Sequence, residues 1–186
     1  LATNGVVHEL DAVLIPENFM APNCGNGTIA ATAVATPDLS TLVAALSAAD
    51  LVSTFNGTDV FTVFAPTNEA FAALGNETIS CLLDKKNVDA LKTVLTYHVV
   101  SGYDLASDIK NGLQVETLET ENLTFAIKGK NVMIDTTANT SATVVAADVF
   151  ATNGVVHVID AVLIPKDFVD NNPCSKDYVA DSAIVV

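Results

Sequence analysis

The sequence predicts an α+β domain whose helices cluster in the first half and pack on a largely antiparallel β-sheet or sandwich. Apolar residues recur at helical spacing in several segments between Thr36 and Tyr97. Short runs rich in β-branched residues then follow one another from Val115 to Leu163. Segregated helices and strands are typical of α+β domains, whereas doubly wound sheets alternate the two.

The helical half begins at Thr36, an N-cap candidate that precedes a proline at the first helical position. The apolar face of this helix is formed by Leu39, Leu42, Val43 and Leu46. A short second turn through Phe55 ends at Asn56-Gly57, and residues 60–65 form a strand that Pro66 stops.

Three further helical segments follow this strand. Thr67 or Asn68 can cap a brief helix that carries Phe71, and residues 79–83 form another. Asn87 caps a third, which ends near Thr96 and is followed by a short strand to Ser101. The strands of the second half are expected at 115–118, 123–128, 132–135, 143–148 and 155–163, with a hairpin turn at 128–131.

An eighteen-residue phrase occurs twice, at residues 2–19 and 151–168, with fourteen identical positions. The offset of 149 residues has the size of a domain rather than of a short solenoid repeat. We therefore expect a fragment of a tandem array. Its parts are residues 1–19 as the C-terminal strand of a preceding repeat, 20–27 as a linker, 28–168 as one complete domain, and 169–186 as a linker or tail.

Charge and hydropathy exclude several partner classes. The formal net charge is −14, with eight Lys and Arg against 22 Asp and Glu, which disfavours nucleic acid and anionic membrane surfaces. No uninterrupted apolar run approaches the roughly 18 residues that cross a bilayer, so direct membrane insertion is not expected. Solubility is the plain explanation of the negative charge.

Residues 6–15 are expected to form a strand that is separated from the sheet of the preceding repeat. We expect this strand to pair with an exposed strand edge and so to cause self-association.

Two features indicate secretion. Five Asn-x-Ser/Thr sequons are present, and we expect glycosylation at Asn26, Asn56, Asn76, Asn122 and Asn139, with chance as the alternative explanation. Cys24 and Cys174 stand at equivalent positions after the two copies of the phrase. If each pairs forward with the following domain, a disulfide joins Cys24 to Cys81. The alternative is three unrelated thiols, with Cys81 buried in a helix.

Three motifs stand in a fixed order along the chain: residues 62–71 (Thr-Val-Phe-Ala-Pro-Thr-Asn-Glu-Ala-Phe), Tyr97-His98, and residues 154–165 (Gly-Val-Val-His-Val-Ile-Asp-Ala-Val-Leu-Ile-Pro). Together they resemble the signatures of the fasciclin domain family, over residues 28–168. The resemblance implies a fasciclin-like fold and a secreted or surface-tethered adhesion or matrix module, often in tandem, often glycosylated, without a catalytic centre.

The resemblance also makes Tyr97 and His98 candidates for adhesion, because the family's Tyr-His pair is implicated in receptor binding. The residues alone favour a different interpretation, in which His98 is half-buried and hydrogen-bonds backbone where the helix meets the strand. His8 and His157 lie in apolar strands without further Cys or His ligands at metal spacing, so both are interpreted as structural.

No nucleophile elbow, phosphate loop or His-Glu-x-x-His helix is present, so we expect no enzyme and assign no catalytic, cofactor-binding or metal-ligating residue. The expected function is an extracellular cell-adhesion or matrix module, secreted or at the cell surface, that acts by multivalent display of tandem repeats. Its partners would be cell-surface or matrix proteins or glycans. The alternative is a glycan- or small-ligand-binding module with a groove between helices and sheet.

Overall fold

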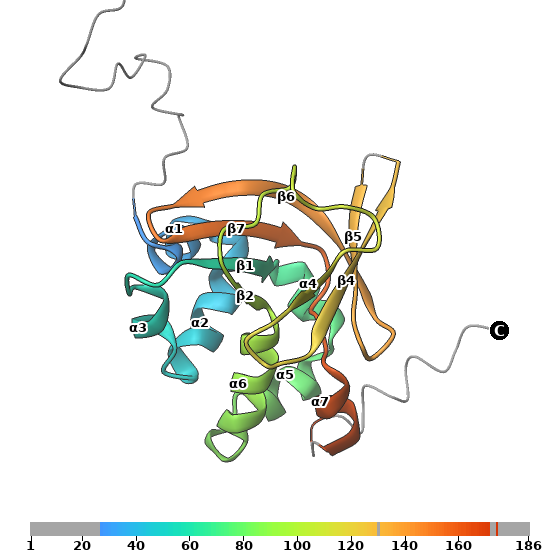
Figure 1. Cartoon of the computed structure of the whole chain (residues 1–186). Helices are drawn as coiled ribbons and strands as arrows, with labels where there is room; N and C mark the ends of the chain where they lie inside the picture. The colour runs from blue at the N-terminus through green and yellow to red at the C-terminus, as the bar shows by residue number, and fades with distance from the viewer. Residues whose placement is uncertain (1–26, 130, 172–173, 175–186) are drawn as a thin grey trace, which may run out of the picture.

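A seven-stranded sheet forms the centre of the computed structural model, which describes residues 27–129, 131–171 and 174 (Figure 1). The strand order is β2-β1-β7-β6-β5-β4-β3. The strands are β1 (Phe61–Pro66), β2 (Val99–Ser101), β3 (Gln114–Glu116), β4 (Asn122–Lys128), β5 (Asn131–Asp135), β6 (Ser141–Ala151) and β7 (Gly154–Ile159). Of these pairings β1 with β7 is parallel, and the others are antiparallel. The predicted fold class is confirmed.

The two end strands of the sheet are linked to each other. A bridge joins Val100 of β2 to Thr117, just beyond β3, and the Leu118 N–H donates to the Val99 carbonyl at 2.9 Å. The sheet therefore nearly closes on itself, and its end strands offer little unpaired backbone for a further strand. Residues 6–15, which we expected to pair with such an edge, lie outside the described residues.

Most helices gather on one side of the sheet (Figure 1). They are α1 (Ile29–Ala35), α2 (Ser40–Ala48), α3 (Val52–Phe55), α4 (Asn68–Ala73), α5 (Asn76–Leu82), α6 (Val88–Tyr97) and α7 (Lys166–Asn171), with the 3-10 turns η2 (Pro37–Leu39) and η3 (Lys85–Asn87). Among the described residues no single helix is long and apolar enough to cross a membrane. Two short core helices, Ile29–Ala35 and Pro37–Ala48, meet the length and composition test only when taken together, across a bend of 110°.

Helix α1 was not predicted, although it lies inside the domain expected to begin at residue 28, because the turn-forming residues 20–27 just before it were interpreted as a linker. Thr28 caps it by accepting a hydrogen bond from the Ala31 N–H at 3.3 Å. Thr36, the predicted cap of the next helix, instead donates its hydroxyl to the Thr32 carbonyl at 3.0 Å, and a 3-10 turn precedes α2. Helix α7 extends beyond the expected domain end at residue 168.

Two apolar cores lie on opposite faces of the sheet, because side chains alternate along each strand. Val63 belongs to the core between sheet and helices, together with Leu42, Leu95 and Phe168. Its neighbour Phe64 belongs to the core inside the curved sheet. The second core contains Tyr97, Phe125, Ile134 and Leu163. Each face of β1 is therefore buried, which explains its continuous apolar sequence.

The repeated Asn-Gly dipeptide fixes the turn between β6 and β7. The buried side chain of Asn153 accepts from the Ile29 N–H at 2.8 Å and donates to the Phe55 carbonyl at 2.9 Å, so it ties α1 and α3 to the sheet. At Gly154 a Cβ atom would lie 1.8 Å from the Phe61 carbonyl oxygen. Only glycine fits there, since β1 passes directly beneath the turn.

The disulfide pairing expected from the sequence is wrong. Cys81 of α5 is bonded to Cys174, which follows α7, so it is not available to Cys24. The reason lies in the packing: α7 and α5 both pack against α6, which brings the Cα atoms of the two cysteines to 5.7 Å. Cys174 is buried and closes the domain to which it belongs, whereas we expected it to pair with a following domain. Cys24 lies outside the described residues.

Candidate functional site

His98 is held in the interior by two backbone hydrogen bonds. Its Nε2 accepts from the Leu163 N–H at 2.9 Å, so the ring hydrogen is on Nδ1, which donates to the Val94 carbonyl at 2.7 Å. The side chain is 2% exposed. Burial lowers the pKa of His98 to about 4, although the bond to Val94 opposes the shift. The neutral His98 side chain therefore joins α6 to the segment that follows β7 through one hydrogen bond to each.

Tyr97 is buried on the opposite side of the sheet, inside the second core. Its hydroxyl accepts from the Thr137 N–H at 3.2 Å and donates to the Asn122 carbonyl at 3.4 Å. Burial raises the pKa of the Tyr97 hydroxyl. Both side chains are buried, and their expected role in adhesion stays a prediction. The interpretation of His98 as a backbone-bonded histidine agrees with its contacts, although it is fully rather than half buried.

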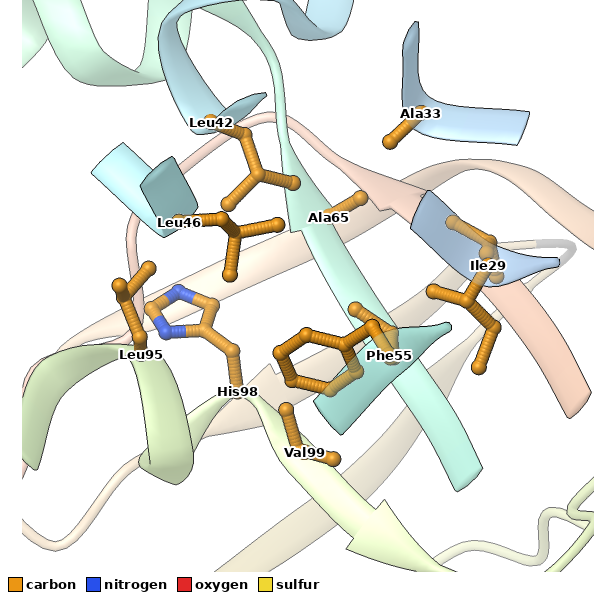
Figure 2. A pocket seen from close by; sticks show the side chains of 11 residues that line it. Ile29, Ala33, Leu42, Leu46, Phe55, Ala65, Leu95, His98 and Val99 are labelled. Atoms are coloured by element: carbon orange, nitrogen blue, oxygen red, sulfur yellow. The ribbon is translucent and has the colours of Figure 1, made fainter. Parts of the chain in front are cut away.

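The described residues form a small cavity between helices and sheet, where the alternative ligand groove was expected. Figure 2 shows His98, Leu95, Phe55 and Leu46 pointing toward a cavity of about 20 Å³. The cavity is lined by Ile29, Ala33, Leu42, Leu46, Phe55, Val63, Ala65, Leu95, His98, Val99 and Val156. This volume has room for about one water molecule, and its walls are apolar apart from the imidazole. The cavity is too small for a sugar or a metabolite.

Four of the predicted glycosylation sites are in the described part of the chain, and all four side chains are exposed. Asn56 follows α3, Asn76 begins α5, Asn122 begins β4 and Asn139 lies in the turn between β5 and β6. These positions leave room for a glycan to face water. Asn26 lies outside the described residues.

An aromatic pair joins the loop that follows β2 to strand β6. The rings of Tyr103 and Phe150 stack with centroids 6.2 Å apart and planes inclined by 16°. Tyr103 is 48% exposed, and Phe150 is partly buried beneath it. Val60, which is 46% exposed, lies beside the base of the loop, since its carbonyl accepts from the Gly102 N–H at 3.0 Å. We call Val60, Tyr103 and Phe150 the Tyr103 patch.

The loop that carries Tyr103 is fixed to the sheet on both sides of the ring. Thr62 of β1 donates its hydroxyl to the Gly102 carbonyl at 3.0 Å, and the same oxygen accepts from the Asp104 N–H at 2.9 Å. Figure 1 shows this segment rising from β2 across β7 and β6. The Thr62 hydroxyl thus bonds the residue before and the residue after Tyr103, so strand β1 fixes the position of the Tyr103 backbone.

His157 and Asp148 hold the next residues of the loop. The Asp148 N–H donates to His157 Nδ1 at 3.3 Å, so His157 Nε2 carries the hydrogen and donates to the Asp104 carbonyl at 3.0 Å. Asp148 lies at a bulge of β6 with φ of 56°, and its carboxylate accepts from the Ala106 N–H at 2.9 Å. His157 is fully buried, which fits its structural interpretation.

Two aspartates adjoin the Tyr103 patch in sequence. Asp104 follows the aromatic residue directly, and Asp59 precedes Val60. Burial raises the pKa of the Asp104 carboxyl, and the nearby Asp108 carboxylate raises it further, while His157 acts in the opposite direction. The segments 59–66, 99–108 and 146–157 contain no lysine or arginine. This surface therefore combines an exposed ring with negative charge.

Within the described ranges, no three His, Cys, Asp or Glu side chains are placed to hold a metal ion. The Tyr103 patch was not predicted from the sequence. Its one local signal is a tyrosine between a glycine and an aspartate in a segment without periodicity. Phe150 is 47 residues away in sequence, so the stacked pair is visible only when the fold is known.

Comparisons with known proteins agree with the fold. The fasciclin domain model matches residues 37–165. Protein sll1483 of Synechocystis sp. is 48% identical over 138 residues, which cover 74% of this chain and 73% of that protein. The transforming growth factor-beta-induced protein ig-h3 of Oryctolagus cuniculus is 35% identical over 164 residues, which are 88% of this chain and 22% of that protein.

The structure is similar to that of a FAS1 domain pair from the insect cell adhesion molecule Fasciclin I. The TM-score is 0.70 at 18% sequence identity, and the match covers 77% of this chain and 53% of that chain. The likeness at this identity supports the fold alone. Because the family model spans more than half of the sequence, the chain belongs to the fasciclin domain family.

Proposed function

We propose that this chain is an extracellular adhesion or matrix module that binds protein partners through its surface and acts by multivalent display of repeats. The observation that carries the proposal is the Tyr103 patch, in which the exposed Tyr103 stacks on the partly buried Phe150 and the loop is fixed by Thr62, His157 and Asp148. Rigid, exposed tyrosines are favoured anchors of protein interfaces because they bury a large area at a small cost in conformational entropy.

The interior supports a surface mechanism. The cavity beside His98 has room for about one water molecule, and the polar atoms of Tyr97 and His98 make hydrogen bonds to backbone groups. A small-ligand module would need a larger cleft with converging polar groups. The disulfide and the exposed sequons are consistent with an oxidising, extracellular location. A relative in fold, Fasciclin I, is itself described as a cell adhesion molecule.

A single patch of this size predicts weak monovalent binding, since stable protein interfaces bury about 800 Å² on each partner. Linking several copies raises the effective concentration of the second contact and can increase apparent affinity by about 10²–10⁴. The repeated phrase at residues 2–19 is the sequence feature that supports a tandem arrangement. The combined binding of several repeats would then give the apparent affinity that one domain lacks.

The test compares one copy with four copies of the same chain. The chain carries a C-terminal biotin and is applied to matrix-coated or cell-coated surfaces either alone or as a streptavidin tetramer. We expect the tetramer to be retained at least about 100-fold more strongly than the monomer. A tetramer with Tyr103→Ala serves as the matched control and should lose most of this gain. Equal retention of monomer and tetramer would refute multivalent display.

A further inference from the structure

The outer face of helix α1 is apolar and exposed. Ala31, Val34 and Ala35 are exposed and lie three and four residues apart, so they share one side of the helix, which we call the α1 face. The Val34 side chain is 67% exposed. Residues 27–49 contain one charged residue, Asp38, although the whole chain has a net charge of −14. An exposed face with apolar side chains and little charge is typical of a surface that another protein body covers.

The chain enters the domain directly over the α1 face. A Cβ atom added to Gly27 would lie 2.6 Å from the Cβ of Ala31, so the Gly27 backbone packs against the first residue of the face. The Gly27 carbonyl accepts from the Thr152 N–H at 3.0 Å, and Thr28 caps the helix. The position of the entering chain is therefore fixed from Gly27 onward, and what precedes it approaches α1 from the exposed side.

The closing segment of this domain belongs to its folded body as far as Cys174. Phe168 of α7 is buried in the core between sheet and helices, and Cys174 is buried in the same core. The disulfide between Cys174 and Cys81 ties this segment to α5. The end of a repeat is therefore held beside α5, and only the chain beyond Cys174 is available to connect it to another repeat.

The first copy of the repeated phrase is followed by a cysteine at nearly the same spacing as the second, five residues after the last phenylalanine instead of six. In the tandem arrangement proposed above, Cys24 would close the preceding repeat as Cys174 closes this one. Only residues 25 and 26 would then separate that closing disulfide from Gly27. Three peptide links span at most about 11 Å. Two folded bodies joined over this distance must touch, because each has a radius of gyration of about 15 Å.

The entry end and the closing end of a repeat differ in charge. The segment 27–60, which contains α1 to α3, has three aspartates and no lysine or arginine. Lys85 and Lys86, the first cations of the chain, are exposed in the turn η3. Asn87 of the same turn donates to the Cys174 Sγ at 3.4 Å, so the lysine pair lies beside the closing disulfide. Charges of opposite sign favour a head-to-tail contact of repeats.

We propose that the α1 face packs against the closing end of the preceding repeat, formed by α5, η3 and the closing disulfide, so that successive repeats make a rigid head-to-tail contact. The proposal rests on the proposed function, because it requires tandem repeats. Such a contact buries the α1 face and fixes the spacing of the Tyr103 patches along the array. Fixed spacing limits which arrangements of partners several repeats can bind at once.

The test joins two copies of the chain at the natural spacing. Residues 1–174 are followed directly by residues 25–186, so that Cys174 takes the place of Cys24 at the junction. The protein is made under oxidising conditions in a host that adds no N-glycans, and its unfolding in urea is compared with that of the single chain. We expect the joined copies to unfold at a urea concentration about 0.5 M higher. A flexible Gly-Ser linker inserted after Cys174 should restore the midpoint of the single chain.

One substitution placed in either copy separates the contact from any effect on the fold. Val34→Glu in the second copy puts a carboxylate into the proposed contact, whereas Val34→Glu in the first copy puts it on a face that no repeat precedes. We expect the second-copy variant to lose the gain from joining. The first-copy variant should lose no more than Val34→Glu costs in the single chain. Val145→Glu in the second copy changes an exposed valine of β6 and should keep the gain.

Peptide mapping of the protein from its natural source tests the connection between repeats. We expect non-reducing digestion to show Cys24 bonded to a cysteine of the preceding repeat, and Cys81 bonded to Cys174. A natural protein without a preceding repeat would refute both this contact and the tandem part of the proposed function.

Two outcomes would overturn the contact alone. These are equal midpoints for the directly joined and the Gly-Ser-linked copies, and equal effects of Val34→Glu in the first and second copies. Both leave multivalent display intact, since flexibly linked repeats can still bind several partners. Equal retention of monomer and tetramer on surfaces, with the difference between the two Val34→Glu variants preserved, would refute multivalent display and leave the contact intact.

Discussion

Acid should destabilise this domain through His98, and the size of the effect follows from its burial. The folded pKa of about 4 lies below the ordinary value of 6.5, because the interior disfavours the charged ring. Above pH 6.5 both states are neutral and the full stability is present. As the pH falls from 6.5 to about 4, the unfolded chain binds a proton that the folded chain does not, so stability is lost.

One proton corresponds to about 1.4 kcal/mol for each pH unit within this window. We therefore expect His98 to remove about 2 kcal/mol of the free energy of unfolding between about pH 7 and about pH 4.5. Below the folded pKa the histidine contributes no further loss. The measurement is equilibrium unfolding in urea at both pH values, for the wild-type chain and for His98→Asn.

The asparagine variant keeps one amide donor near the Val94 carbonyl and leaves the Leu163 N–H without its acceptor. It should lose about 1–3 kcal/mol at every pH, but its stability should depend less on acid than that of the wild-type chain. His157→Gln is the matched control, since it removes a different buried histidine and should keep the acid response of His98. If wild type and His98→Asn lose the same free energy on acidification, the reasoning is refuted.

Two further predictions concern the covalent and steric constraints of the fold. Cys174→Ser should lower the free energy of unfolding by about 2–4 kcal/mol, because the disulfide to Cys81 closes a loop of 93 residues. Recovery of a Cys24–Cys81 peptide in non-reducing peptide mapping would contradict this pairing. Gly154→Ala should lower the free energy by at least about 3 kcal/mol in urea unfolding, since its Cβ would lie 1.8 Å from a carbonyl oxygen. Gly112→Ala is its control, because that Cβ meets nothing within 4 Å and only the strain of a positive φ, about 1–2 kcal/mol, remains. Equal losses in the two glycine variants would show that the close approach at Gly154 does not matter.

The order and type of most elements could be predicted from the sequence because they depend on neighbours within a few residues. Pro66 ends β1 and Thr67 caps α4, with its hydroxyl accepting from the Ala70 N–H at 3.2 Å. Helix α6 was predicted from its apolar face and ends at Tyr97, one residue beyond the predicted end. The missed helix α1 had a local signal in Thr28, but the glycines and proline before it favoured a linker.

Contacts between segments distant in sequence could not be predicted. Asn68 was considered as a cap for its own helix, yet its amide oxygen accepts from the Thr41 N–H at 2.9 Å and so binds the start of α2. Such a contact cannot be read from spacing, because one polar side chain can satisfy any backbone group that the fold brings near it.

By itself the sequence determined the fold class, the succession of strands and helices, and the family, because periodicity, caps and turn residues act locally and the three motifs stand in a fixed order. The tertiary structure alone decided which cysteine pairs with Cys81, that Tyr97 and His98 are buried, and that Tyr103 stacks on Phe150. Burial and pairing depend on how the nearly closed sheet and the helices packed on it place residues 47 or 93 positions apart against one another. Patterns within a few residues of the sequence do not show which distant residues come into contact.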